Sequence, residues 1–275
     1  MVTNKQIIMS YNSFKNNVYE HLAEHLAKYK YNGWKPGYFK GKTYNHIVDI
    51  DGKTKEEIVK TIIEEDGVCP KEFRKPHMYA HHLNSSQVIC YEFFKPLIEN
   101  KDNMSKVVNK MEIPFQISNN FEAVFEKKFE NGDGTNFDFF LSDNKHNIYI
   151  EVKYTEQGFA SCKNDKNHRK KFEDIYRNRI KDSFCIKDSF CIEKNEIDYF
   201  TQNYQLFRNV LQIQKETDFV VFLFPKENSI AKKEFEDFRD TYLSEKGKNN
   251  VKGVFWEDLT DFMSSTFKEK FFFYI

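Results

Sequence analysis

Residues 136–154 read NFDFFLSDNKHNIYIEVKY, and this stretch decides the fold. It predicts a β-hairpin with Asp138 on its first strand and Glu151 and Lys153 on its second. Because successive side chains on a strand point to opposite faces, Glu151 and Lys153 share one face of an otherwise apolar strand. Asp138 likewise interrupts a run of phenylalanines. Charges on such strands are costly to bury unless they are paired or bind a metal.

Two interpretations of these three residues remain open at this point. Two carboxylates on adjacent strands can hold Mg²⁺, which prefers hard oxygen ligands. A nearby lysine can orient or deprotonate a water, which completes the apparatus for hydrolysing a phosphodiester. In a chain that is 31% charged, the same triplet can also mark the solvated face of an antiparallel strand with no chemistry.

The composition indicates a globular protein of 275 residues, 40% hydrophobic and 17% aromatic. Lys+Arg and Asp+Glu number 42 each, so any basic nucleic-acid footprint must be local. No run approaches the roughly 18–20 apolar residues of a membrane span, and the N-terminus lacks the apolar stretch of a signal peptide. Five cysteines without a Cys-x-x-Cys indicate neither a disulfide framework nor a zinc site. We therefore expect a cytoplasmic protein.

The first 80 residues are predicted to form a mainly helical extension. An amphipathic helix is expected over residues 11–30, a short strand at His46–Ile50, a second helix at Lys55–Glu65 and an irregular connector over 67–80. A boundary near residue 80 separates this extension from a core over 81–275, the two forming one continuous globular unit. His21 and His25 are interpreted as residues of a solvated helix face rather than as zinc ligands. The three histidines before the next helix are interpreted as exposed or packed loop residues: His77, His81 and His82.

The core is predicted to be α/β. A helix over Ser85–Asn100, capped by Asn84 or Ser85, carries the polar Gln87 on its buried stripe. Further elements are expected in chain order: strands Phe121–Phe129, Asn136–Ser142 and Ile148–Tyr154, a turn over 131–134, a helix over Phe200–Thr217, strands Thr217–Phe224 and Val251–Trp256, and a short helix over Glu257–Ser264. The apolar tail 271–275 is expected to pack on the core or on a partner chain.

Two polar groups are candidate nucleic-acid contacts. The helix over Phe200–Thr217 presents three amides and one guanidinium on one face, a composition suited to phosphate or base contacts: Gln205, Arg208, Asn209 and Gln212. A locally basic segment is the second candidate, with a plain solvated surface as the alternative. Its DNA-binding candidates are Lys163, Lys166, Arg169, Lys170 and Lys171.

The hexapeptide KDSFCI occurs twice in succession, at Lys181–Ile186 and Lys187–Ile192. A perfect tandem copy is typical of a recent duplication in the gene. It predicts a tolerant surface loop.

The order helix, meander with Asp and Glu-x-Lys, helix and strand resembles the PD-(D/E)xK nuclease core. Flanking strings are similar to those of a bacterial group of restriction endonucleases in this superfamily. These strings are LNSSQVICYEFFKPL at 83–97, Phe137-Asp138, EVKYTE at 151–156, YQLFRN at 204–209 and WEDL at 256–259. The resemblance covers roughly residues 75–260, and it implies a central mixed β-sheet flanked by helices.

The resemblance also implies roles for individual residues. Asp138, Glu151 and the Val152 carbonyl would bind the metal, Lys153 would be the catalytic lysine, and Gln205 would assist it. Accessory positions would be Ser86 and Gln87 on the first helix, where relatives often carry a Glu, and Arg208 and Asn209. Phe137 stands where the motif has a proline, and the missing helix acid leaves open whether one or two metals bind.

The expected function is Mg²⁺-dependent cleavage of duplex DNA by a restriction endonuclease, with Mn²⁺ able to substitute. Repair or recombination cleavage by the same site is an enzymatic alternative. A nucleic-acid-binding protein whose nuclease fold is inactive, or a structural subunit of a phage-defence system, are alternatives of other classes. Expected partners are double-stranded DNA, a second copy of the chain in a homodimer, and an associated methyltransferase, with no membrane involved.

Overall fold

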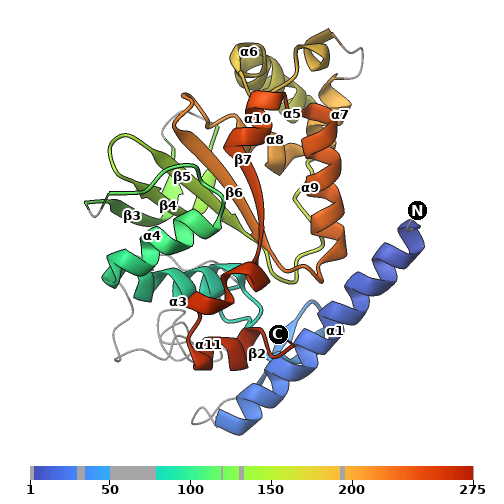
Figure 1. The fold of residues 1–275 in the computed structure, drawn as a ribbon. Coiled ribbons are helices and arrows are strands. Elements are labelled where there is room, and N and C mark those ends of the chain that lie inside the picture. The colour runs from blue at the N-terminus through green and yellow to red at the C-terminus, as the bar shows by residue number, and fades with distance from the viewer. Residues whose placement is uncertain are drawn as a thin grey trace.

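A five-stranded mixed sheet forms the centre of the protein (Figure 1). The computed structural model describes residues 3–29, 35–49, 79–118, 120–129, 133–192 and 196–274. The strand order is β3-β4-β5-β6-β7; β3, β4 and β5 are antiparallel neighbours, and β5, β6 and β7 are parallel. The strands are β3 (Glu122–Lys128), β4 (Asn136–Ser142), β5 (Asn147–Val152), β6 (Asp218–Phe224) and β7 (Val251–Phe255). This sheet confirms the predicted α/β core and its three-strand meander.

Helices cover both faces of this sheet, and the strands divide their side chains between two cores. Ile148 and Ile150 of β5 join the core under α3 (Ser86–Glu99), whereas Tyr149 joins the core on the opposite face. The alternation predicted for this strand is therefore confirmed. The remaining helices of the core are α4 (Lys101–Lys110), α5 (Lys166–Lys171), α6 (Arg177–Asp182), α7 (Glu196–Gln202), α8 (Tyr204–Val210), α9 (Ser229–Tyr242), α10 (Glu245–Asn250) and α11 (Ser265–Phe271).

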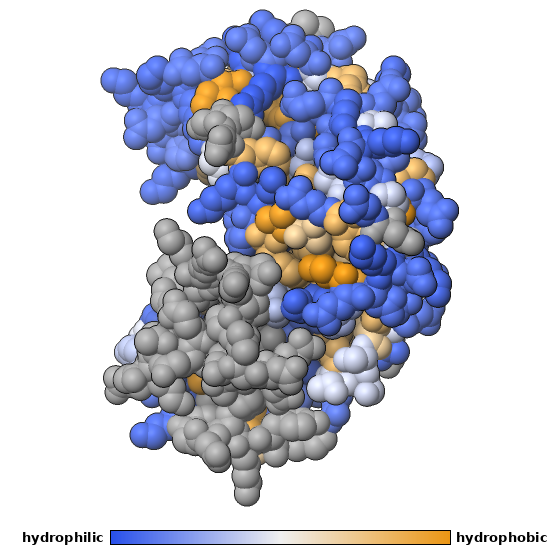
Figure 2. Space-filling view, turned by 90° about the vertical axis from the view of Figure 1, so that its left-hand side faces the viewer, coloured by the Kyte–Doolittle hydropathy of each residue, from blue (hydrophilic) through white to orange (hydrophobic). Residues whose placement is uncertain are grey.

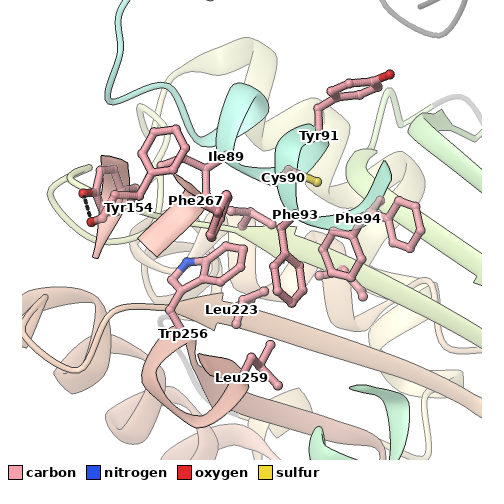
Figure 3. Close-up of a cluster of buried hydrophobic side chains, with 14 of the residues drawn as sticks. Ile89, Cys90, Tyr91, Phe93, Phe94, Tyr154, Leu223, Trp256, Leu259 and Phe267 are labelled. Atoms are coloured by element: carbon pink, nitrogen blue, oxygen red, sulfur yellow. Dashed lines mark hydrogen bonds between the residues drawn. The ribbon is translucent and has the colours of Figure 1, made fainter. Parts of the chain in front are cut away.

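Aromatic side chains fill the core beneath α3 (Figure 3). Phe93 meets Trp256 edge to face, with ring centroids 5.1 Å apart, and Phe267 of α11 packs on both rings. Such rings bury large areas, roughly 150–250 Å² each. The apolar tail belongs to this core, since Phe271 and Phe272 are buried. The short helix expected at Glu257–Ser264 is the 3₁₀ helix η4 (Trp256–Phe262).

The N-terminal part packs on the core rather than standing apart from it. The helix α1 (Asn4–Tyr29) buries Tyr11, Phe14, Val18, Leu22 and Leu26, which confirms its predicted amphipathic character. Ser229 at the start of α9 donates a hydrogen bond to the carbonyl of Ile7, at 2.7 Å. His25 on this helix is only 5% exposed, so its interpretation as a solvated residue is wrong. Across the described residues, no helix is both long and apolar enough to cross a membrane.

A two-stranded ribbon follows α1, formed by β1 (Pro36–Phe39) and β2 (Lys42–Val48). Only the second strand was expected from the sequence. Lys40 and Gly41 at its turn both have positive φ, 46° and 84°, as a two-residue hairpin turn requires. The expected helix at Lys55–Glu65, most of the connector over 67–80 and His77 lie outside the described residues.

The single helix expected over Phe200–Thr217 is wrong, because α7 and α8 are separate helices that break at Asn203. The cause is a neighbouring segment of extended chain. The Cys162 N–H donates to the Thr201 carbonyl and the Gln205 N–H donates to the Ala160 carbonyl, so these backbone groups are bonded across the break. Competition from residues 160–162 thus divides the helix.

The tandem hexapeptide is not a tolerant surface loop. In the first copy Cys185 and Ile186 are buried, and Ile186 forms a β-bridge with Leu243. In the second copy Phe190 is buried against Phe207 and Tyr242. The two identical sequences therefore pack into the same core in different conformations, and the surface-loop prediction is wrong.

Deleting the second copy, residues 187–192, should destabilise the fold because it removes the packed ring of Phe190. Phe190→Ala alone should cost about 3–5 kcal/mol of unfolding free energy, the usual range for a buried phenylalanine. Phe184→Ala, at the equivalent and only half-buried position of the first copy, is the matched control and should cost less. Urea unfolding measures all three, and an equal cost for the two alanine variants would contradict this packing.

Candidate active site

Three carboxylates lie in one row across the sheet where its ladders are interrupted. The pairing of β4 with β5 ends at Phe139 and Ile150, and continuing its register sets Asp138 opposite Glu151. The pairing of β3 with β4 skips Glu126, whose φ is 54°, and the same register sets Glu126 opposite Asp138. Positive φ is uncommon for residues other than glycine, and such strain concentrates at functional sites.

The side chain of Asp138 takes the place of a backbone acceptor where the pairing of β4 with β5 ends. Its Oδ2 accepts a hydrogen bond from the Val152 N–H at 2.7 Å, so the backbone amide that leaves the ladder stays satisfied. Burial raises the pKa of Asp138 well above its ordinary value, and the carboxylates of Glu151 and Glu126 raise it further. The row is thus a concentration of negative charge that favours a cation.

Glu151 is the most enclosed of the three acids, with 5% of its surface exposed. Its Oε1 accepts hydrogen bonds from Lys153 Nζ at 3.0 Å and from Gln205 Nε2 at 2.6 Å, and its Oε2 accepts one from Asn209 Nδ2 at 3.3 Å. These donors satisfy both oxygens of a buried charge, as such a charge requires. The structure thus brings Glu151, Lys153, Gln205 and Asn209 together.

Lys153 is held in its charged form. Burial acts to lower the pKa of its ammonium group, but the carboxylates of Glu151, Glu156 and Asp138 outweigh burial, and the net pKa is raised. The group therefore stays protonated at neutral pH. In this state it can orient a water or stabilise negative charge.

Gln205 is held in place through both its side chain and its backbone. Its side-chain oxygen accepts from the Ala160 N–H at 3.0 Å, while its own N–H donates to the Ala160 carbonyl at 3.0 Å. The break between α7 and α8 therefore places the first turn of α8 beside β5. The side-chain nitrogen of Gln205, Nε2, is then directed at Glu151 and donates a hydrogen bond to it.

The other two residues of the predicted polar face, Arg208 and Gln212, bond partners other than Glu151. Arg208 donates to Thr135 Oγ1 at 3.3 Å and stacks over the ring of Tyr204. Gln212 is 3% exposed and donates to Asp133, and Asn209 is 2% exposed. The expectation that this whole face contacts DNA is therefore wrong for Asn209 and Gln212, because protein atoms bury both.

Gln87 reaches the row from the opposite layer. Its Nε2 donates to Glu126 Oε1 at 2.8 Å, and Asn136 donates to the other oxygen of Glu126. Ser86, at the start of α3, lines a neighbouring groove. Sequence reasoning missed Glu126, which lies five residues before the turn predicted at 131–134, whereas Asp138 lies four residues after it.

The chain that leaves the site is anchored by three elements. Trp256 Nε1 donates to the Lys153 carbonyl at 3.2 Å, Asn228 Nδ2 donates to the Tyr154 carbonyl at 2.9 Å, and the Tyr11 hydroxyl donates to the Thr155 carbonyl at 2.8 Å. Side chains supported in this way keep a precise geometry. The site is thus held by α1, η4 and the start of α9 together.

The basic segment divides into exposed and engaged side chains. Lys163, Lys166 and Arg169 are exposed, and so is Lys170, which pairs with Asp174. Lys171 is half-buried and donates to the Asp133 carbonyl at 2.6 Å. Figure 2 shows a predominantly hydrophilic surface over the end of the molecule where Figure 1 places α5 and α6.

Comparison with known proteins identifies the family. The chain matches the family described as Restriction Endonuclease associating with ARP over residues 21–271. No curated protein and no solved structure matches it. The family match spans nearly the whole chain and includes every residue of the row and its partners on α3 and α8. The chain therefore belongs to this restriction endonuclease family, as the motifs of its sequence predicted.

Proposed function

We propose that the protein is a metal-dependent endonuclease that hydrolyses phosphodiester bonds of duplex DNA, with its active site at Asp138, Glu151 and Lys153. One observation carries this proposal: Glu151 is buried beside Asp138 at diverging strands and held by Lys153, Gln205 and Asn209. A restriction role follows from the family, and repair or recombination cleavage would use the same site. The intact acids and lysine favour an active enzyme over an inactive binding protein.

The oxygen donors of the row fit Mg²⁺. Within the described part of the chain, no group of three or more His, Cys, Asp or Glu side chains is arranged as a metal-binding cluster. Mg²⁺ does not need such a cluster, because it commonly uses one or two carboxylates and keeps several waters. Asp138 and Glu151 would hold the ion, with the Val152 carbonyl as a further ligand. Burial is the main cause of the raised pKa of Asp138, and the neighbouring acids raise it further, a repulsion that an added cation would relieve.

When bound, Mg²⁺ supplies a Lewis acid that neutralises charge developing on the scissile phosphate. The chain's own residues would do the rest. The Lys153 ammonium, fixed by Glu151, would orient the attacking water and stabilise the phosphate oxygens. Gln205 and Asn209 would keep the Glu151 carboxylate in one orientation. Glu126, held by Gln87 and Asn136, would add negative charge where the related helix acid is absent.

Partners are proposed on separate grounds. The exposed cations near α5 would contact DNA phosphates, which dominate affinity for duplex DNA. Association with ARP is proposed from the family description alone. A homodimer, an associated methyltransferase and a cytoplasmic location also remain proposals.

Asp138→Asn, Glu151→Gln and Lys153→Gln should each reduce plasmid cleavage by about a thousandfold or more. Each removes several kcal/mol of transition-state stabilisation, and about 1.4 kcal/mol corresponds to a factor of ten in rate. Glu122→Gln, on the exposed start of β3, is the control and should cut normally. Thermal unfolding must show that each variant is folded. Normal cleavage by a folded Asp138 or Glu151 variant would refute the assigned site.

Mg²⁺ and Mn²⁺ should support cutting, whereas Ca²⁺ should support DNA binding without turnover, because its larger and looser shell positions water less well. Titration calorimetry with Mn²⁺ gives a readout independent of cleavage. Asp138→Asn and Glu126→Gln should weaken Mn²⁺ binding relative to Glu122→Gln. Cleavage that persists after EDTA treatment and dialysis would overturn the proposed metal dependence.

Neutralising Lys163, Lys166 and Arg169 together should weaken binding to all DNA sequences and flatten its salt dependence. Each lost phosphate contact lowers the slope of log affinity against log salt by about 0.9. Lys106→Gln/Lys110→Gln, on the exposed side of α4, is the control for charge alone. An unchanged slope in the triple variant would show that DNA does not approach over α5.

A further inference from the structure

The β1–β2 ribbon carries a basic surface that also exposes an aromatic ring. Lys35, Lys40 and Lys42 are exposed, and no acidic residue occurs between Lys35 and Val48. The whole chain has as many acids as bases, so this local excess is distinctive. Tyr38 is 72% exposed, the most exposed of the large apolar or aromatic side chains in the described residues. Lysines interleaved with exposed aromatic rings are typical of nucleic-acid-binding surfaces.

A groove of about 520 Å³ lies between this ribbon, the start of α3 and the segment that follows Lys153. Phe39 and Lys40 of the ribbon form one side, while Ser86 of α3 and Thr155 form another. Thr155 comes two residues after Lys153, and Ser86 precedes Gln87, which bonds Glu126. The groove thus lies between the ribbon and two segments that are close in sequence to the row of carboxylates.

The groove has a mixed polar and aromatic lining that includes one acid. Glu156 lines it, but its Oε2 accepts from the Tyr154 N–H and its charge faces Lys153. Asn84 donates to Thr155 Oγ1 at 2.7 Å, while its own Oδ1 is buried without a hydrogen-bond partner.

The position of the ribbon complements that of the basic segment. Figure 1 shows β2 toward the lower end of the molecule and α5 at the upper end, with the sheet between them. A duplex lying along the site would therefore meet cations on both sides of the cleavage position. A two-stranded β-ribbon is also an element that the major groove of B-DNA admits.

We propose that the β1–β2 ribbon is a DNA-contacting element of this nuclease that grips the duplex on one side of the scissile phosphate. Lys35, Lys40 and Lys42 contact phosphates there, and Tyr38 packs on deoxyribose or an exposed base. The groove behind the ribbon receives the strand that leads to the active site. This inference rests on the proposed function and adds the element that holds the substrate.

The test compares Lys40→Gln/Lys42→Gln with the control Lys106→Gln/Lys110→Gln. DNA binding is measured in Ca²⁺ over a range of salt concentrations, beside thermal unfolding and Mn²⁺ titration. In the ribbon variant, the slope of log affinity against log salt concentration should fall by about 0.9 for each of the two lost phosphate contacts. The α4 control should keep the wild-type slope. Tyr38→Ala should lose affinity by roughly 5- to 100-fold at every salt concentration, as a stacking contact does. Mn²⁺ affinity should be unchanged in all of these variants.

The outcomes separate this inference from the proposed function. Wild-type protein that neither binds nor cuts DNA would refute the proposed function itself. Wild-type protein that cuts, with a ribbon variant matching the α4 control in slope and affinity, would refute the ribbon while leaving the nuclease intact. Loss of slope in the ribbon variant with normal unfolding and normal Mn²⁺ affinity would establish it as a DNA contact.

Discussion

The structure depends on how the negative charge of one buried carboxylate, that of Glu151, is balanced by hydrogen-bond donors. Glu151 lies at the end of a central strand, almost out of contact with water. A charge in that position is retained only if donors surround it. Lys153 provides a countercharge from the same strand, but Gln205 and Asn209 come from a helix more than fifty residues later in the chain. The break at Asn203, the extended segment at 160–162 and the position of α8 all serve this one requirement.

Much of the fold was predictable because its signals are local. The meander follows from its turn residues and from the alternation along β5. Ile148, Ile150 and Val152 of that strand join one core and Tyr149 joins the other, as expected. The mixed sheet came from the family resemblance, and the structure agrees with it. The helices α4, α9 and α10 were not assigned from the sequence. Their many charged residues obscure the apolar stripes, and in α9 only Ala231, Phe235 and Phe238 are buried.

Site residues that share a strand or a motif were predicted from the sequence. A site residue whose position depends on the pairing of distant strands was missed. Asp138, Glu151 and Lys153 stood out from spacing, and Gln205 and Asn209 from the motif. Glu126 entered only through the register of β3 against β4. The tandem hexapeptide makes the same point, since one six-residue sequence takes two conformations. Tertiary contacts, rather than local preference, choose between them.

The bond between Trp256 and the Lys153 carbonyl also gives the site an optical signal. The chain has two tryptophans, and the other, Trp34, lies outside the described residues. Trp256 is fully buried, and its indole N–H points at the backbone of the candidate catalytic lysine. A shift of that backbone changes the polarity and hydrogen bonding around the indole. Replacing Trp34 would therefore leave a single tryptophan, and its fluorescence, excited where tyrosine absorbs little, would report events at the end of β5 in real time without a label.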